Sequence, residues 1–442
     1  MKTSRRDFLR KTSLITTGIG LSSGVGFSKG VISANDKINI GLIGCRNQGF
    51  SVLKNMLQTD QVNCLGLCDI DQAILEEKLA EVKNDFKQSP KTYGDFRNLL
   101  ENKEIDAVIV GTPDHWHCLQ TILACQAGKD VYVEKPLANS IYECDLMVKA
   151  AQKYNRVVQV GQQQRSGDVW KGVMDYIKSD QIGTLRKVNI WANFNYGIGT
   201  LKKEDQPVPS GVDYNFWLGP APERSFNETR FHGNWRHFWD YGGGLMTDWG
   251  VHLIDMALWA KDVTSEPREV LVYGKNLSFK EYNRETYDTM SVIYPMEDYV
   301  INWQHTAGPQ NGPYNIPYGM EFVGDRATVI ADRGNWSVQL DNQEDTKQAG
   351  LDTLKFKKES NYSDMGNHVR NFIDCIRSRN KTNCPIETGK NVALYAHMAN
   401  IGARTDTGRL MWEEKSQSFS KNDKANALIK PTYRPVWNYP LI

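Results

Sequence analysis

Short apolar, β-branched runs alternate with stretches of helical periodicity over the first third of the chain. The expected strands are 37–45, 62–70, 106–112, 130–136 and 155–162, and the expected helices are 50–58, 72–86, 95–101, 116–127 and 140–153. Strand–helix alternation at this spacing is typical of a parallel, doubly wound sheet.

The pattern changes after about residue 165. A helix (168–179) and a strand (185–194) precede a stretch rich in Pro, Gly and Trp (197–240), which has little periodicity. Between 268 and 340 apolar and polar positions alternate, which predicts an antiparallel sheet with one covered face. Further helices are expected from about 245, over 364–379 and over 389–403. We therefore predict an α/β domain (35–162) followed by an α+β domain with an open, mainly antiparallel sheet (163–442).

Composition and charge narrow the classes of function. The 442 residues are 40% hydrophobic and 24% charged, enough for two domains with cores of their own. The formal net charge is +1, but residues 1–34 hold six basic side chains and one acidic one, so the remainder carries −4. A mildly acidic body without a basic patch argues against a nucleic-acid partner.

The first 34 residues have the features of an export signal. Ser4-Arg5-Arg6-Asp7-Phe8-Leu9 resembles a twin-arginine motif, a Gly/Ser/Thr-rich apolar stretch follows, and Ala34 ends a plausible cleavage site. We expect residues 1–34 to be a signal peptide read by the twin-arginine export machinery, with a periplasmic mature protein. An uncleaved, membrane-anchored form is the alternative.

The eight cysteines are spread through apolar runs without a CxxC pair, so we expect reduced core residues. The twin-arginine route carries folded proteins, which reconciles reduced thiols with export. No cluster of metal ligands stands out, so no metal is expected.

A glycine turn joins the first expected strand to the first helix. In "GLIGCRNQG", Gly44 and Gly49 match the outer glycines of a G-x-G-x-x-G fingerprint, whereas Arg46 replaces the middle one. Asp69, 20 residues after Gly49, stands where an acid accepts hydrogen bonds from the adenosine ribose and repels a 2′-phosphate. The pattern favours NAD over NADP, although Arg46 keeps NADP open.

Three blocks together resemble the Gfo/Idh/MocA oxidoreductases. They are the modified glycine turn with Asp69, "GTPDHWHCLQTILACQAGKDVYVEKPLA" (111–138) and "GGGLMTDWGVHLIDMALW" (242–259). The resemblance spans about residues 36–403 and implies a Rossmann domain that binds NAD, followed by a substrate-binding and oligomerisation domain.

The resemblance also implies the catalytic residues. Lys135, within Glu134-Lys135-Pro136, would bond the substrate oxygen and stabilise its developing negative charge. His252 would be the general base, because histidine titrates near neutrality. Asp248, four residues earlier on the same helix, would bind substrate hydroxyls or tune His252. A satisfied core pair is the structural alternative for Asp248 and His252.

The remaining expected site residues divide into two sets. The cofactor set is Gly44, Arg46, Asn47, Gln48, Gly49, Asp69, Thr112, Pro113, Trp116, His117, Glu134, Lys135 and Gln164. The substrate set is Lys135, Arg165, Tyr196, Trp235, Asp248 and His252. Five tryptophans fall within residues 217–259, and flat aromatic faces beside hydrogen-bonding groups suit a sugar or polyol, although most of the five could be core residues.

These observations lead to one main hypothesis and two alternatives. We expect an exported NAD(H)-dependent oxidoreductase that oxidises a secondary hydroxyl of a sugar, glycoside or polyol. Because NAD is scarce outside the cytoplasm, the cofactor should be tightly held. The alternatives are an NAD-dependent glycoside hydrolase that acts by transient ring oxidation, and a redox-inactive sugar-binding protein. A homo-oligomer formed through the open sheet is also expected.

Overall fold

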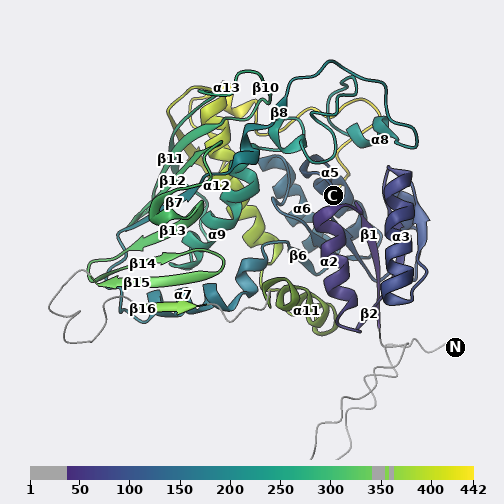
Figure 1. The fold of residues 1–442 in the computed structure, drawn as a ribbon, viewed down its shortest axis with the longest axis horizontal. Helices are drawn as coiled ribbons and strands as arrows, with labels where there is room; N and C mark the ends of the chain where they lie inside the picture. Colours follow the sequence, from purple (N-terminus) through teal and green to yellow (C-terminus); the bar gives the residue numbers. More distant parts are fainter. Residues whose placement is uncertain (1–36, 341–353, 358–362) are drawn as a thin grey trace, which may run out of the picture. The chain divides into compact units, whose positions relative to one another are not determined.

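The computed structural model describes residues 37–340, 354–357 and 363–442, so the expected signal (1–34) lies outside the described residues. Its first part is a six-stranded parallel sheet in the order β3-β2-β1-β4-β5-β6 (Figure 1). The strands are β1 (Ile38–Ile43), β2 (Val62–Cys68), β3 (Lys91–Tyr93), β4 (Ala107–Val110), β5 (Asp130–Val133) and β6 (Val158–Val160). The parallel sheet is confirmed, and β3 was missed because it is short and mostly exposed.

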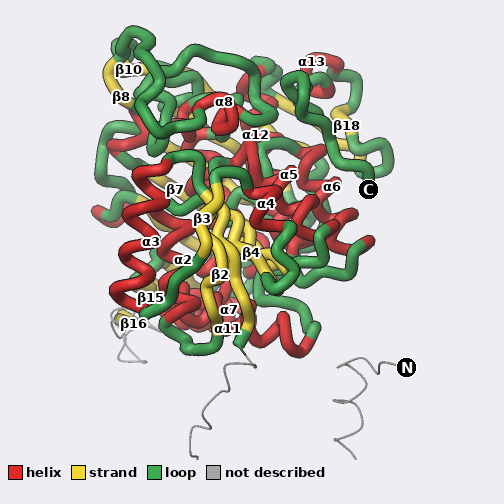
Figure 2. The backbone as a smooth tube through the Cα atoms, turned by 90° about the vertical axis from the view of Figure 1, so that its right-hand side faces the viewer, coloured by secondary structure: helices red, strands yellow, loops and turns green. Residues whose placement is uncertain are grey.

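Helices cover both faces of this sheet, with α2 and α3 on one side and α5 and α6 on the other (Figure 2). Their bounds are α2 (Asn47–Leu57), α3 (Gln72–Phe86), α4 (Phe96–Leu100), α5 (Asp114–Gln126) and α6 (Ile141–Lys153). Because both faces are covered, β4 and β5 are buried along their whole length. The strand order reverses between β1 and β4, which opens a crevice at the carboxyl ends of these strands.

The second part is built on a ten-stranded sheet in the order β16-β15-β14-β13-β7-β12-β11-β9-β17-β18. The strands are β7 (Lys187–Ala192), β9 (Glu269–Lys275), β11 (Thr289–Pro295), β12 (Val300–Thr306), β13 (Tyr318–Val323), β14 (Ala327–Ala331), β15 (Asn335–Leu340), β16 (Leu354–Lys357), β17 (Arg409–Glu413) and β18 (Ser418–Phe419). Neighbouring strands of this sheet pair antiparallel, except β7 with β12, which are parallel. The expected alternation is confirmed on β11, where Met290, Val292 and Tyr294 are buried while Ser291 and Ile293 are exposed.

Helices cover one face of this sheet and join it to the first part. The helices on this face are α7 (Asp168–Lys178), α9 (Val251–Trp259) and α12 (Ile386–Arg404), whereas α11 (Ser363–Ser378) packs in the core of the first part. Helix α12 packs against β9 on one side and α6 on the other, and α11 packs against α2. These two helices therefore bring the substrate-side elements against the Rossmann sheet.

The remaining elements are short. They are α8 (Tyr214–Leu218), α13 (Asp423–Asn426), the two-stranded ladder of β8 (Thr200–Leu201) and β10 (Tyr282–Asn283), the π-helical turn η5 (Met246–Gly250), and the 3-10 turns η2 (Gln163–Ser166), η3 (Asn195–Ile198), η4 (Trp235–His237) and η6 (Pro313–Asn315). The segment 197–240 is mostly irregular, as its composition indicates. It forms an aromatic core of its own that includes Tyr214, Trp217 and Phe231.

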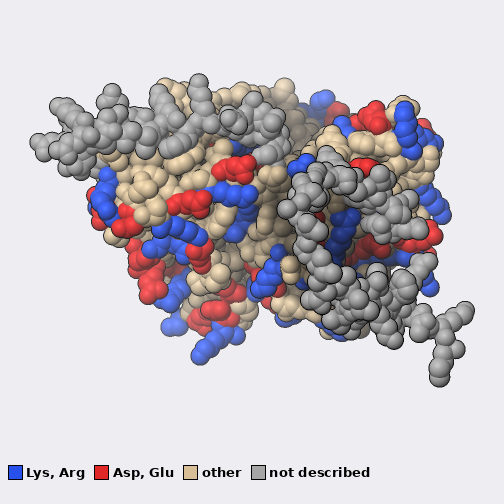
Figure 3. Space-filling view, turned by 90° about the horizontal axis from the view of Figure 1, so that it is seen from below, with Lys and Arg blue, Asp and Glu red and all other residues tan. Residues whose placement is uncertain are grey.

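All eight cysteines lie within the described residues, where each is buried and free. No helix in the described ranges is both long and apolar enough to cross a membrane. On the face drawn in Figure 3, the described positive and negative side chains are interspersed.

Candidate active site

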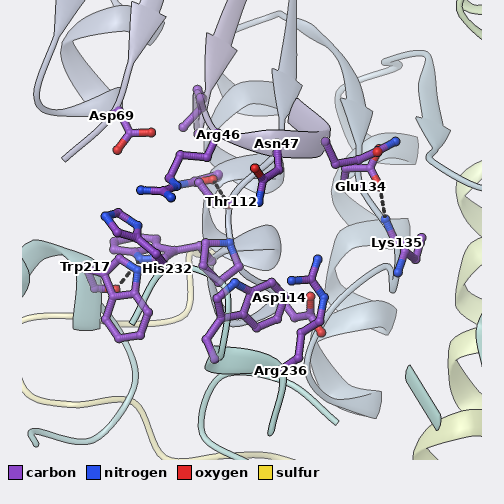
Figure 4. Close-up of a pocket in the computed structure, with 18 of the residues that line it drawn as sticks. Arg46, Asn47, Asp69, Thr112, Asp114, Glu134, Lys135, Trp217, His232 and Arg236 are labelled. Atoms are coloured by element: carbon purple, nitrogen blue, oxygen red, sulfur yellow. Dashed lines mark hydrogen bonds between the residues drawn. The ribbon is translucent and has the colours of Figure 1, made fainter. Parts of the chain in front are cut away.

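A cavity of about 300 Å³ lies at the crevice of the parallel sheet. One end is formed by Arg46, Asp69 and His232, and the other by Lys135 and His252. Figure 4 shows the first three grouped on one side, with Glu134 and Lys135 on the opposite side. The other lining residues are Ile43, Gly44, Asn47, Gln48, Cys68, Ile70, Gly94, Phe96, Gly111, Thr112, Pro113, Asp114, Trp116, Gln120, Glu134, Gln163, Phe216, Trp217, Trp235, Arg236, Asp248, Trp249 and Arg333.

The glycine turn after β1 is as tightly packed as a dinucleotide turn requires. Gly44 has φ +87°, and a Cβ on Gly49 would lie 2.4 Å from the Gly44 carbonyl oxygen. Arg46 has φ −91°, so its backbone accommodates a side chain where the fingerprint has its middle glycine. Among the described residues, no side chain caps the first turn of α2, and Asn47 and Gln48 of this turn line the cavity. This uncapped helix start, with the Arg46 side chain beside it, fits a pyrophosphate.

Asp69 directly follows β2 and is held in place by the backbone. Its Oδ2 accepts a hydrogen bond from the Cys45 amide at 2.7 Å, and its Oδ1 accepts one from the Asp71 amide at 3.1 Å. Burial raises the pKa of Asp69. A fixed acceptor at this edge fits the ribose of an adenosine, so the residues present fit the dinucleotide that the sequence predicts.

The loop after β4 forms part of the cavity wall. Thr112 and Pro113 line it, and the Thr112 hydroxyl donates to Gln120 Oε1 at 2.7 Å. His117 has both ring nitrogens near backbone carbonyl oxygens, at 2.8 Å from Pro136 and 2.9 Å from Thr112. It is fully buried and is not among the lining residues, so the expected cofactor contact of His117 is not supported by its position. The ring instead joins the loops that follow β4 and β5.

Trp116 lines the cavity but is 3% exposed. Its ring stacks on Phe216 at a centroid distance of 5.4 Å and meets the edge of Phe96 at 5.6 Å. Its indole N–H donates to the Trp217 carbonyl oxygen at 2.9 Å. The indole thus connects α5 to the segment that follows β8.

Lys135 lies two residues after the end of β5, and its peptide bond with Pro136 is cis. Its Nζ lies 2.5 Å from Asp248 Oδ1 and 2.8 Å from the Asp248 carbonyl oxygen. An ammonium has three N–H groups, so one remains for a substrate oxygen. Glu134 is buried, and burial raises its pKa to about 7.

Asp248 stands on the π-helical turn η5, which leads into α9. Tyr196 donates its hydroxyl to Asp248 Oδ2 at 2.7 Å, and Arg236 Nε lies 3.2 Å from Oδ1. Burial alone would raise the pKa of Asp248, but the charges of Lys135 and Arg236 hold it well below its usual range. The carboxylate therefore stays ionised and organises three side chains around it.

His252 lies one turn further along and is 4% exposed. Burial lowers the pKa of its imidazole well below the usual value, and the charges of Arg333 and Lys135 lower it further. Its Nδ1 has no hydrogen-bond partner among the described residues. A neutral imidazole at the cavity wall can accept a proton, which a satisfied core histidine could not do.

Gln164 and Arg165 differ from their expected placement. Gln163, not Gln164, lines the cavity, and the Gln164 side chain is buried elsewhere. Arg165 is not a lining residue, because its guanidinium binds Asp255 with N–O distances of 2.7–2.9 Å and stacks over Trp259. The expected substrate contact of Arg165 is therefore not supported, and the pair links η2 to α9.

Several lining residues were outside the sequence-based set. Arg236 and His232 lie in the tryptophan-rich stretch 217–259, but the sequence does not indicate that their side chains point into the cavity. Burial raises the pKa of Asp114, which lies beside Arg236 (Figure 4). Arg333 lies in the turn between β14 and β15, and its guanidinium carbon is 4.3 Å from the centroid of the Trp249 ring. The sequence carries no signal that Arg333 contacts the site. Within the described residues, no three His, Cys, Asp or Glu side chains gather as a metal site.

Two family models match the chain. Residues 38–162 match the oxidoreductase family with an NAD-binding Rossmann fold, and residues 171–282 match the C-terminal alpha/beta domain of the oxidoreductase family. Together they cover more than half of the chain.

Curated relatives match over shorter segments. A glycosyl hydrolase family 109 protein of Solibacter usitatus (strain Ellin6076) is 32% identical over 165 residues, or 35% of this chain and 38% of the relative. One from Shewanella sp. (strain W3-18-1) is 33% identical over 122 residues, or 27% of each chain. The match thus spans less than two fifths of the length of these relatives.

Solved structures share the fold across most of the chain. Aldose-aldose oxidoreductase from Caulobacter crescentus, complexed with glycerol, has a TM-score of 0.64 and 17% identity, and covers 85% of this chain and 99% of its own. Levoglucosan dehydrogenase with NADH and levoglucosan has a TM-score of 0.63, 17% identity and the same coverage. The WlbA dehydrogenase from Bordetella pertussis, with NADH and UDP-GlcNAcA, has a TM-score of 0.62 and 18% identity over 85% and 98%.

The Arg165–Asp255 pair gives a first prediction. Asp255→Asn leaves a buried guanidinium without its carboxylate, so we expect a loss of about 3–5 kcal/mol in the free energy of unfolding. Denaturant unfolding measures this loss, and the dissociation constant for NAD should stay unchanged. Asp180→Asn breaks an exposed pair with Arg326 and serves as a control with little effect. Unchanged stability with a raised KM for substrate would return Arg165 to the substrate set.

Proposed function

The chain belongs to the Gfo/Idh/MocA oxidoreductase family, and from that premise we propose that it oxidises a secondary hydroxyl of a sugar, glycoside or polyol, with tightly held NAD as the hydride acceptor. The observation that carries this proposal is the convergence of Lys135 and His252 on one cavity from opposite parts of the fold. The same cavity holds the glycine turn and Asp69, which fit the dinucleotide.

The two side chains divide the chemistry of alcohol oxidation. The remaining N–H of Lys135 donates to the alcohol oxygen and stabilises its developing negative charge. His252 is neutral because of burial and the neighbouring positive charges, so a ring nitrogen accepts the hydroxyl proton. NAD supplies the hydride acceptor when bound. The alcohol thereby loses a hydride and a proton and becomes a ketone.

The substrate end suits a molecule with apolar faces and many hydroxyls. The rings of Trp235 and Trp249 line it beside Arg236, Asp114 and Arg333. Aromatic faces pack against the C–H faces of a sugar ring while the polar groups bond its hydroxyls. That solved relatives of the same fold carry levoglucosan or UDP-GlcNAcA supports this substrate class.

Export and assembly are further proposals. The twin-arginine pattern at Arg5 and Arg6 supports export to the periplasm, where a cofactor loaded in the cytoplasm would have to be retained. The exposed side chains of Tyr273 and Ile293 on the uncovered face of the large sheet support a homo-oligomer formed there.

The proposed reaction is tested by turnover and by two variants. Purified protein should show nicotinamide reduction at 340 nm with a panel of sugars and glycosides. Lys135→Ala and His252→Ala should each keep bound NAD and lose about 100-fold or more in kcat, the size of a general acid/base contribution. Lys149→Ala changes an exposed lysine of α6 and should leave kcat unchanged. Near-normal turnover by both site variants would refute the assignment.

A second candidate function is hydrolysis of a glycoside by transient oxidation. It is favoured by the curated relatives named glycosyl hydrolase family 109 proteins. In this scheme a C3 ketone acidifies the C2 proton, the C1 substituent is eliminated, water adds, and the ketone is reduced again. Such an enzyme should release aglycone with no net reduction of NAD and no added acceptor. Release that requires an added acceptor would exclude this scheme.

The position of Arg333 predicts a shift in the pH profile. The charge of Arg333 lowers the pKa of His252, and the other charged or titratable groups acting on His252 are Lys135, Asp248 and His368. Only neutral His252 accepts a proton, so activity falls as the pH drops through its pKa. Arg333→Gln should raise that pKa and move the acidic limb of kcat/KM to higher pH.

The matched variant Arg333→Lys retains a positive charge at this position, so its acidic limb should stay near that of the unmodified protein. If the acidic limb of the kcat/KM profile lies at the same pH for Arg333→Gln and the unmodified protein, Arg333 does not set the pKa of His252.

A further inference from the structure

The adenosine end of the cavity is covered by a segment from the second part of the fold. We call residues 207–241 the strap. Its Gly211 carbonyl oxygen accepts from the Gln72 amide at 3.0 Å, and its Asp213 amide donates to the Ile70 carbonyl oxygen at 3.0 Å. These bonds fasten the strap to the end of β2 and the start of α3.

The strap then supplies part of the cavity wall. Phe216, Trp217 and His232 line the cavity together with Asp69 and Ile70. The Nε2 atom of His232 lies 2.9 Å from Asp71 Oδ2, so the strap is also bonded beside the carboxylate that fits the ribose. A dinucleotide bound here would therefore contact the strap at its adenosine end.

The last described residues of the chain hold the strap in that position. Arg434 donates three side-chain hydrogen bonds to it: to Asn215 Oδ1 at 2.7 Å, to the Asn215 carbonyl oxygen at 2.8 Å and to the Gly219 carbonyl oxygen at 3.1 Å. The Arg434 amide donates to the Pro220 carbonyl oxygen at 2.9 Å. The yellow C-terminal segment runs beside α8 in Figure 1.

Aromatic contacts reinforce the same connection. The ring of Trp437 meets Trp116 edge-on at 4.9 Å and Phe216 at 5.6 Å. The guanidinium of Arg97 lies over the rings of Phe216 and Trp437 at 5.6 and 5.5 Å. Residues of α4, α5, the strap and the C-terminal segment therefore form one packed layer over the adenosine end.

The C-terminal segment is itself anchored to the Rossmann part. The Tyr433 hydroxyl donates to Glu143 Oε1 at 2.6 Å, and the Ile429 carbonyl oxygen accepts from the Tyr142 amide at 3.2 Å. Further along, Gln126 Nε2 donates to the Leu441 carbonyl oxygen at 3.0 Å. The segment thus bonds α5 and α6 on one side and the strap on the other.

We propose that residues 429–442 form a clasp that keeps the strap closed over the adenosine end and so slows cofactor exchange, with Arg434 as a positioning residue. This inference rests on the proposed function, because it requires a dinucleotide in this cavity. The inference goes beyond the proposed function by naming the segment that retains the dinucleotide. The strap is also bonded to α5 through the Trp217 carbonyl oxygen, and the clasp adds four hydrogen bonds from Arg434 to residues 215–220.

The experiment follows the release of bound NAD from the full chain. Protein loaded with isotopically labelled NAD is mixed with an excess of unlabelled NAD, and the label that remains bound is measured by mass spectrometry after rapid desalting. Arg434→Ala should release the label at least about tenfold faster, a factor equal to about 1.4 kcal/mol. Arg434→Lys can replace only some of the three guanidinium hydrogen bonds, so its release rate should lie between those of Arg434→Ala and the unmodified protein. Arg409→Ala removes an exposed arginine of β17 and should match the unmodified protein.

A second measurement separates a clasp from general weakening. Hydrogen exchange in Arg434→Ala should increase at strap amides such as those of Asp213 and Trp217, and should stay unchanged in β11 and β12. With saturating NAD, kcat should stay within about threefold of the unmodified value. Faster exchange throughout the chain, or an unchanged release rate, would overturn the proposal. Should Arg434→Ala fail to fold, Trp437→Leu carries the same expectations and the same contrary outcomes.

The two proposals fail differently. A protein that retains labelled NAD in an Arg434-dependent way but oxidises no sugar contradicts the proposed function and supports the clasp. A protein that turns over sugar but releases NAD at the same rate with or without Arg434 contradicts the clasp alone.

Discussion

The ion pair between Lys135 and Asp248 is the constraint on which the site depends. Lys135 ends a strand of the parallel sheet, and Asp248 begins a helix that packs on the other sheet, so the pair can form only when both parts of the fold meet. Its side chains are 12% and 13% exposed, and a charge left there without its partner would be costly. Tyr196 and Arg236 satisfy further acceptor positions of the same carboxylate. The pair therefore fixes the geometry of the cavity, while burial and the charge of Arg333 are the main causes that lower the pKa of His252 and keep it neutral.

Much of this could be predicted from the sequence, for identifiable reasons. The parallel sheet follows from local periodicity, and the carboxyl ends of its strands necessarily share one edge, which brings Gly44 and Lys135 to one crevice. The spacing of Asp248 and His252 likewise places both near the start of one helical segment, although Asp248 lies on the π-helical turn η5 and His252 in the first turn of α9. In each case a local sequence pattern was enough to predict where the residues lie, because regular secondary structure fixes the positions of residues at a given spacing.

The features that escaped prediction depend on irregular backbone or on contacts between distant segments. The 3-10 turn η2 places Gln163 rather than Gln164 in the cavity and turns Arg165 towards Asp255, and no periodicity indicates that turn. His117 lies in the first turn of α5, yet its ring contacts backbone carbonyl oxygens of two loops and does not line the cavity. Arg333 reaches the site from the turn between β14 and β15, where its guanidinium lies over the Trp249 ring of η5. The strap carries no periodic signal either, since it packs around its own aromatic core.

The strap lines both ends of the cavity, but the clasp bonds only residues 215–220 of the strap, next to the part at the adenosine end. Phe216, Trp217 and His232 of the strap line the adenosine end, whereas Trp235 and Arg236 of the strap line the substrate end together with Trp249 and Arg333. Under the proposed clasp, a substrate can enter and leave at one end while the dinucleotide is retained at the other. A retained dinucleotide must also be returned to its first redox state within the same cavity, so the substrate end has to accept a carbonyl as well as an alcohol. The remaining N–H of Lys135 can donate to either oxygen, and His252 can give back the proton that it accepted, so one pair of side chains is chemically sufficient for both directions.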